Sequence, residues 1–203
     1  MKSDATQPTP ARRRQEMKAF LAEHAFRLLR DCANTPFNHE AVAASAGVSA
    51  RTAYRYFPAQ SDLIEAVWHQ LRDTTGTIWP VNESVILMDL RTLFAQFERN
   101  DALTRAMLAA GARANYSEHG SAEGRTAFRI ALSARLDRLT VESGDQLVAT
   151  CVAIYSAPFW QMLRDRGQLS PAAAVDAACA TMQAVLAAAF DGFTTPPAPP
   201  TGA

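Results

Sequence analysis

The side chains with the clearest chemical potential in this 203-residue sequence lie together in one short stretch. They project from a predicted helix on the side opposite Ala53 and Phe57, which are apolar and one helical turn apart. Arginine can donate two hydrogen bonds to guanine, threonine can contact bases or phosphates, and a tyrosine hydroxyl can donate to a phosphate oxygen. The residues are Arg51, Thr52, Tyr54 and Arg55. Their shared face indicates a surface that reads DNA.

The segment that must position them, residues 38–57, has the pattern of two short helices joined by a tight turn, NHEAVAASAGVSARTAYRYF. Asn38 can cap the first helix and Ser49 the second, because each side-chain oxygen can accept from free backbone N–H groups. Gly47 stands where a left-handed backbone turns the chain at little cost. Small residues such as Ala53 let the two helix axes approach. We therefore predict a helix-turn-helix, whose second helix enters the DNA major groove.

An ordinary helical hairpin with a solvated outer face would share this turn, but the continuation of the sequence favours the DNA-binding motif. Residues 46–67, AGVSARTAYRYFPAQSDLIEAV, closely resemble the N-terminal domain of the TetR family of bacterial repressors. That family carries an Ala-Gly-Val-Ser turn, a Thr-x-Tyr-x-Tyr/His-Phe recognition helix, a loop, and a long helix that starts with an acidic residue and Leu. The resemblance extends over residues 14–67. One departure is the loop, where the family often has a capping Ser or Asn and a phosphate-binding Lys but this chain has Ala59 and Gln60.

The resemblance implies a ligand-responsive transcriptional regulator, expected to be a repressor, that works in the bacterial cytoplasm. It would bind a palindromic operator in double-stranded DNA as a homodimer and be released by a small-molecule effector. A constitutive or architectural helix-turn-helix protein with no effector pocket remains the alternative. The candidate DNA-binding residues are Arg12, Arg13, Arg14, Asn38, Ser49, Arg51, Thr52, Tyr54, Arg55, Tyr56 and Gln60.

The distribution of charge supports contact with DNA at one end of the chain only. The net charge is zero, but residues 1–60 carry 9 Lys and Arg against 5 Asp and Glu, whereas residues 61–203 carry 11 against 15. A basic part on an acidic remainder is expected when only one end contacts phosphates. Within the basic part, the run 12–14 is either a solvated charge cluster or an arm that contacts phosphates or the minor groove.

The sequence contains no pattern typical of an enzyme or a metal site. It has no Gly-rich phosphate loop, no His-Glu-x-x-His, no Gly-x-Ser-x-Gly and no Cys-x-x-Cys. Glu65 and His69 are two ligands without a third, so a surface pair is expected. Three distant cysteines in apolar contexts indicate a reduced, cytosolic protein. We therefore expect no catalytic activity, cofactor or metal. We also expect no membrane partner, because no apolar run approaches the roughly 20 residues of a membrane span.

The abundance of Ala and the lack of alternating β-branched runs predict an all-α fold of about nine helices. Beyond the two helices of the motif, the predicted helices span 11–32, 60–75, 83–99, 101–115, 122–139, 144–166 and 171–190. Pro158 is expected to kink the helix over 144–166. The predicted organisation is a disordered tail at 1–10, a helix-turn-helix domain at 11–60, a connecting helix and linker at 61–82, an effector-binding and dimerisation domain at 83–191, and a disordered Pro-rich tail at 192–203.

Large, adaptable side chains are abundant in the C-terminal part, as in both protein cores and apolar ligand pockets. The resemblance implies a cavity among these helices that binds a small effector. The candidate effector-binding residues are Trp79, Phe94, Phe97, Met107, Tyr116, Phe128, Tyr155 and Trp160. Tyr116, Tyr155 and Trp160 are favoured because each combines an apolar body with a hydrogen-bonding tip.

The last two predicted helices have apolar residues at spacings of three and four, and mostly Ala fills the other positions of the final helix. A helix that is apolar all round needs a partner on each side. The resemblance implies that the two helices pair with their copies in a second subunit as a four-helix bundle, whereas a core helix of a monomer would show a similar pattern. The candidate interface residues are Leu147, Cys151, Ile154, Val175, Cys179, Met182 and Leu186.

Overall fold

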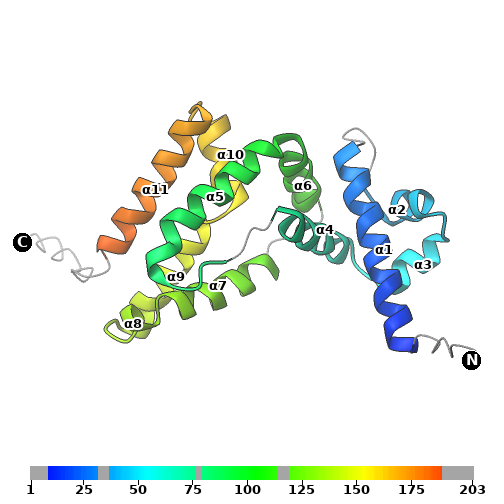
Figure 1. The fold of residues 1–203 in the computed structure, drawn as a ribbon, viewed down its shortest axis with the longest axis horizontal. Helices are drawn as coiled ribbons and strands as arrows, with labels where there is room; N and C mark the ends of the chain where they lie inside the picture. The colour runs from blue at the N-terminus through cyan, green and yellow to red at the C-terminus, as the bar shows by residue number, and fades with distance from the viewer. Residues whose placement is uncertain (1–8, 32–36, 76–78, 114–118, 189–203) are drawn as a thin grey trace, which may run out of the picture. The chain divides into compact units, whose positions relative to one another are not determined.

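The computed structural model describes residues 9–31, 37–75, 79–113 and 119–188, and every regular element in these ranges is a helix (Figure 1). The all-α prediction is confirmed. Cys32, Tyr116 and almost all of the two predicted tails lie outside the described residues. The chain forms two compact units, one of residues 1–77 with 100–120 and the other of residues 78–99 with 121–203. We describe each unit by itself.

The first unit is built around one long helix, α1 (Pro10–Asp31), which packs against each of the other helices of the unit. These are α2 (His39–Ala46), α3 (Ala50–Tyr56), α4 (Gln60–Thr75) and α6 (Asp101–Arg113). The inner face of α1 carries Leu21, Ala25 and Leu29 at intervals of four residues, and all three are buried. Leu63, Ile64 and Val67 of α4 meet them in one apolar core. Burial of each large apolar side chain contributes about 1.5–3 kcal/mol to this core.

Helix α6 belongs to this first unit although it follows α5 in the chain. Its residues Leu103, Met107 and Ala110 lie in the same apolar core as α1 and α4. The predicted organisation, which groups residues 83–191 in one effector-binding domain, stays a prediction. In the structure, α6 falls in the first compact unit and not with the rest of residues 83–191.

The second unit is a bundle in which α5 (Ile86–Arg99) and α11 (Pro171–Ala188) pack along each other (Figure 1). Helices α9 (Val141–Ile154) and α10 (Ala157–Asp165) pack against each other and against α11. The remaining elements are the short 3-10 helix η1 (Glu83–Val85), most of α7 (His119–Ala131) and α8 (Ser133–Leu136).

Two of the predicted long helices are each interrupted, so the described residues form eleven α-helices rather than about nine. The prediction that Pro158 kinks a continuous helix is wrong. The chain leaves the helix at Tyr155, and a new helix begins after Ser156, whose hydroxyl oxygen accepts from the Phe159 N–H at 3.3 Å. Pro158 then occupies the first turn of α10, where its missing N–H costs no hydrogen bond. The second break lies at Leu132, which is buried and has φ −103° and ψ 11°.

Helix α11 is the helix of the described residues that is long and apolar enough to cross a membrane by length and composition. One such helix is weak evidence, because a core helix of a soluble protein passes the same test. One face of α11 lies in the core of the second unit through Ala174, Ala178, Cys179, Met182 and Leu186. The expectation that the protein has no membrane partner stays a prediction.

A buried arginine connects three elements of the second unit. The guanidinium of Arg135 on α8 pairs with the carboxylate of Glu83 on η1, with Nε 3.2 Å from Oε2. It also donates to the backbone carbonyl of Leu186, in the last turn of α11, where carbonyls have no partner within the helix. Arg135 is 8% exposed and Glu83 40%, so the ion pair is partly shielded from water.

Replacing Glu83 should destabilise the second unit, because Glu83→Gln removes the negative charge that pairs with the buried guanidinium of Arg135. We expect a loss of about 1–3 kcal/mol in the free energy of unfolding, less than for a fully buried pair because Glu83 is partly exposed. Urea denaturation monitored by circular dichroism measures this loss.

The matched control is Asp176→Asn, which breaks the pair between Arg91 and Asp176, whose side chains are 54% and 71% exposed. An exposed pair contributes under about 1 kcal/mol, so this variant should unfold close to wild type. Equal losses in the two variants would show that Arg135 does not depend on Glu83.

Candidate functional site

Local hydrogen bonds fix the turn between α2 and α3 as the sequence predicts. The Asn38 side chain accepts from the Ala41 N–H at 2.8 Å, and the Ser49 hydroxyl oxygen accepts from the Thr52 N–H at 3.2 Å. Gly47 has φ 67° and ψ 28°, in the left-handed region. The N–H of Val48 then donates back to the Ala43 carbonyl at 3.0 Å, which closes the end of α2. These observations confirm both predicted caps and the predicted glycine turn.

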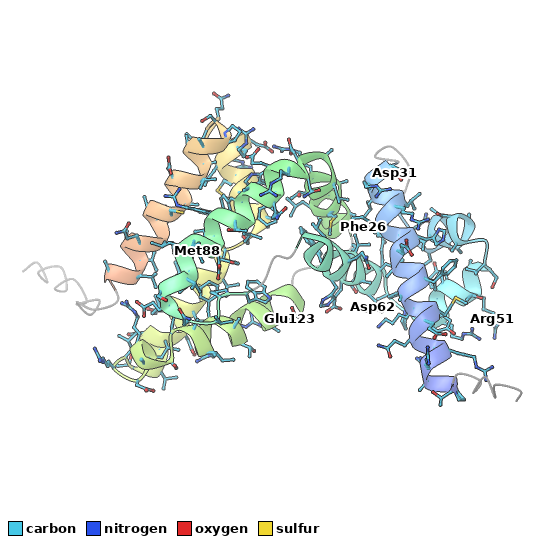
Figure 2. All side chains as sticks on the ribbon, viewed as in Figure 1. Phe26, Asp31, Arg51, Asp62, Met88 and Glu123 are labelled. Atoms are coloured by element: carbon cyan, nitrogen blue, oxygen red, sulfur yellow. The ribbon has the colours of Figure 1, made fainter. Side chains whose placement is uncertain are left out.

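The inner and outer faces of α3 also agree with the prediction. Ala53 and Phe57 have no exposed surface. Arg51, Tyr54 and Arg55 are exposed, and Thr52 is half-buried. Figure 2 shows Arg51 on the side of α3 that faces away from α1. Three hydrogen-bonding side chains therefore stand on one solvent-facing surface of a seven-residue helix.

The other candidate DNA-binding residues near α3 are partly engaged within the protein. The side chains of Asn38 and Ser49 act as helix caps. The Gln60 side-chain amide donates to the Phe37 carbonyl at 2.6 Å, so it helps to fix the start of α4. Tyr56 is half-buried against the core of the first unit, and the guanidinium of Arg55 lies 5.0 Å from the centre of its ring.

The three arginines at the start of α1 are exposed, and Arg12 pairs with Glu16 at 2.9 Å. One turn after the run, the ammonium of Lys18 lies 5.4 Å from the centre of the Phe57 ring. This contact brings the N-terminal half of α1 next to the C-terminal end of α3. The basic run 12–14 therefore belongs to the same unit as the outer face of α3 and lies on the helix that supports it.

Two residues that we did not predict organise the outer face of α3. His39 is buried, and its Nε2 lies 2.7 Å from the Phe57 carbonyl oxygen. Its ring stacks on the ring of Tyr54, with centroids 4.0 Å apart and planes at 14°. The Tyr54 hydroxyl donates to Glu40 at 3.1 Å, and this hydrogen bond raises the pKa of Tyr54. Sequence spacing gave no signal for these contacts, because they join α2 to α3 across the turn.

The candidate effector-binding residues are distributed between the two units. Met107 lies in the core of the first unit, and Tyr116 lies outside the described residues. The others belong to the second unit, where Phe94, Phe128 and Trp160 have no exposed surface. They are Trp79, Phe94, Phe97, Phe128, Tyr155 and Trp160.

These six residues form two chains of ring contacts. Phe97 lies between Phe94 and Trp160, with centroids 5.9 Å and 5.7 Å apart. The Trp160 indole N–H donates to Glu98 at 2.8 Å, and Arg164 pairs with the same carboxylate at 2.8 Å. In this first series of rings, the indole nitrogen of Trp160 is therefore paired within the protein.

The second chain places Tyr155 between Trp79 and Phe128, with both pairs of centroids 5.5 Å apart. The Trp79 indole N–H is buried and has no hydrogen-bond partner among the described residues. Burial raises the pKa of Tyr155, and the negative charge of Asp89 raises it further. Burial also raises the pKa of the Asp89 carboxyl. A buried donor with no partner in the described part of the chain and a half-buried carboxylate therefore accompany this series of aromatic rings.

Among the described residues, no group of three or more His, Cys, Asp or Glu is arranged to hold a metal ion. Glu65 and His69 lie 3.7 Å apart on the surface of α4, as the predicted two-residue pair.

A comparison of the structure with solved structures finds a TetR transcriptional regulator from Rhodococcus sp. RHA1, with a TM-score of 0.53 and 22% sequence identity. The match covers 91% of this chain and 100% of the other chain. The fold is TetR-like. Comparison of the sequence with models of known families and with characterised proteins gives no match.

In this TetR-like fold, most of the candidate interface residues lie in the core of the second unit. Cys151 and Met182 have no exposed surface, four others are buried, and Val175 is half-buried. The four are Leu147, Ile154, Cys179 and Leu186. The assignment of these side chains to a subunit interface stays a prediction. The positions of α11 that face solvent are mostly small residues, including Ala180, Thr181 and Ala184.

The thiol of Cys151 should resist alkylation in the folded protein, because burial raises its pKa to about 12 and keeps it protonated. At pH 8 we expect iodoacetamide to modify it at least about 100-fold more slowly in buffer than in urea, measured by peptide mass spectrometry. A raised thiol pKa stabilises the fold below the pKa of the unfolded thiol, about 8.5, and this contribution is lost as the pH rises toward 12. Equal rates in buffer and urea would contradict the placement of Cys151 in the core.

Proposed function

We propose that this protein is a transcriptional regulator that binds double-stranded DNA through α3. The observation that carries the proposal is the capped helix-turn-helix with Arg51, Tyr54 and Arg55 on its exposed face. The likeness of the fold to a TetR transcriptional regulator supports it. Arginine at this position can donate two hydrogen bonds to a guanine, which is the commonest base-specific contact. The run 12–14 would contact phosphates and add affinity that is independent of sequence.

We propose that the DNA-bound form is a homodimer on a palindromic operator. Two copies of α3 would then enter major grooves separated by about 34–36 Å, one turn of the DNA helix. Helix α11 supports this proposal, because it is apolar but only 28% of it is buried within the protomer. We assign a second copy of the chain to the outer face of α11, where small side chains permit close approach of helices.

We propose that the second unit binds a small-molecule effector whose binding releases the operator, so that the protein acts as a cytoplasmic repressor. The buried indole N–H of Trp79, which has no hydrogen-bond partner among the described residues and lies beside Tyr155, supports a ligand with a hydrogen-bond acceptor at this point. The effector can shift the equilibrium between the DNA-binding and released states only by as much as its affinities for the two states differ.

The alternative is a constitutive DNA-binding protein with a filled core, and one observation favours it. Phe94, Phe128 and Trp160 have no exposed surface, so much of the candidate effector-binding set is packed against protein. The likeness of the fold to that of a transcriptional regulator supports regulation rather than catalysis in both readings.

Arg51→Ala tests DNA binding. An operator is first selected from a library of random duplexes, and affinities are then measured by fluorescence anisotropy. Loss of a bidentate contact to guanine should weaken operator binding by about 1–3 kcal/mol and relax the preference at that base. Sedimentation of the wild-type complex should show two protomers for each operator.

The matched control is Arg27→Ala, which removes the same charge from an exposed position on α1. It should change operator affinity much less than Arg51→Ala. If wild type selects no sequence from the library, the proposed function is wrong. If Arg51→Ala binds the operator like wild type, α3 reads DNA without Arg51.

A thermal-shift screen of small apolar and cationic compounds tests the effector proposal. A compound at 100 times its dissociation constant should stabilise the protein by about 2.7 kcal/mol. The same compound should stabilise Trp79→Phe less, because this variant keeps an apolar ring but lacks the N–H donor. It should also weaken binding of the wild type to the operator. Hits that stabilise both proteins equally and leave operator affinity unchanged would favour the constitutive alternative.

A further inference from the structure

The hydroxyl of Tyr54, a candidate phosphate contact, already has an acidic partner within the protein. It donates to Oε1 of Glu40 at 3.1 Å, and both side chains are exposed on the same surface of the helix-turn-helix. The hydrogen bond raises the pKa of Tyr54, so the hydroxyl keeps its proton at neutral pH. Glu40 lies in the first turn of α2, where a negative charge is favoured by the helix dipole. The carboxylate oxygen is therefore held where it accepts from the hydroxyl.

A tyrosine hydroxyl has one proton to donate, whereas an ionised carboxylate and a DNA phosphate only accept. The Tyr54 hydroxyl therefore cannot donate to Glu40 and to a phosphate at the same time. Contact with DNA requires that the bond to Glu40 breaks. The negative charge of Glu40 also repels a phosphate that approaches the hydroxyl.

Stacking on His39 fixes the orientation of the Tyr54 ring. The two rings stack at 4.0 Å with nearly parallel planes. His39 is itself buried, and its Nε2 donates to the Phe57 carbonyl oxygen at 2.7 Å, since a carbonyl can only accept. The hydroxyl therefore stays at one point, where either Glu40 or a phosphate oxygen can accept its proton.

We propose that Glu40 takes the place of a DNA phosphate in the free protein and so lowers the affinity for DNA of any sequence. This inference rests on the proposed function in DNA binding. Glu40 is a positioning residue that acts through Tyr54, not a residue that reads bases. Because phosphate contacts supply the sequence-independent part of binding, its effect is the same on the operator and on random DNA.

Glu40→Gln tests the proposal, because it removes the charge but keeps the size of the side chain. Affinity is measured by fluorescence anisotropy for a random-sequence duplex of about 30 base pairs at low salt, where sequence-independent binding is strong. We expect Glu40→Gln to bind this duplex about 3–10-fold more tightly than wild type. In the Tyr54→Phe background, Glu40→Gln should raise the affinity no more than Glu23→Gln, the charge control, raises it.

The charge control is Glu23→Gln, which removes the same charge from an exposed residue of α1 whose carboxylate pairs with Arg27. A second variant, Glu40→Asp, keeps the charge and its place in the first turn of α2, but its shorter side chain withdraws the acceptor from the hydroxyl. It should also bind more tightly than wild type. Thermal unfolding of each variant shows whether the motif is intact, and Glu40→Asp decides the question if Glu40→Gln does not fold.

Three outcomes would overturn the inference while the proposed function stands. In the first, Glu40→Gln and Glu40→Asp both bind the random duplex like wild type. In the second, Glu40→Gln raises affinity as much in the Tyr54→Phe background as in the wild-type background. In the third, Glu40→Gln raises affinity no more than Glu23→Gln does. A wild-type protein that does not bind the random duplex at low salt would instead contradict the proposed function itself.

Discussion

The left-handed backbone at Gly47 is the constraint on which the helix-turn-helix depends. With φ at 67°, the chain reverses within a few residues of the end of α2, and Val48 can donate back to Ala43. An L-residue with a side chain would be strained in this conformation, whereas glycine adopts it freely. Because the turn is so short, α2 and α3 pack against each other, and the small residue Ala53 on the inner face of α3 is fully buried.

Close packing of α2 against α3 has a consequence for the chemistry of the outer face. It brings the first turn of α2 beside the middle of α3, so His39 and Glu40 reach Tyr54. The exposed face of α3 is therefore not a row of independent side chains. One of its donors is stacked, hydrogen-bonded and held in place by residues of the neighbouring helix, which ties affinity for phosphates to the packing of the motif.

In the second unit, one helix buries one face in the core and exposes the other to solvent. Helix α11 buries its larger side chains, such as Met182 and Leu186, against the unit, and Arg135 binds the carbonyl end of the helix. What remains outside is mostly alanine. The aromatic chains around Tyr155 and Trp160 differ in one respect: the indole of Trp160 is paired with Glu98, and that of Trp79 has no partner among the described residues.

Local features of this protein followed from the sequence alone, because they depend on neighbours within one helical turn. The all-α class, the caps at Asn38 and Ser49, the turn at Gly47 and the outward face of α3 are of this kind. The tertiary structure decided what depends on residues far apart in the chain. It placed α6 in the core of the first unit, most of the candidate interface residues in the core of the second, and Pro158 at the start of a new helix. It also joined His39 and Glu40 to Tyr54, because an apolar stripe at helical spacing says that a face is buried but not which helix buries it.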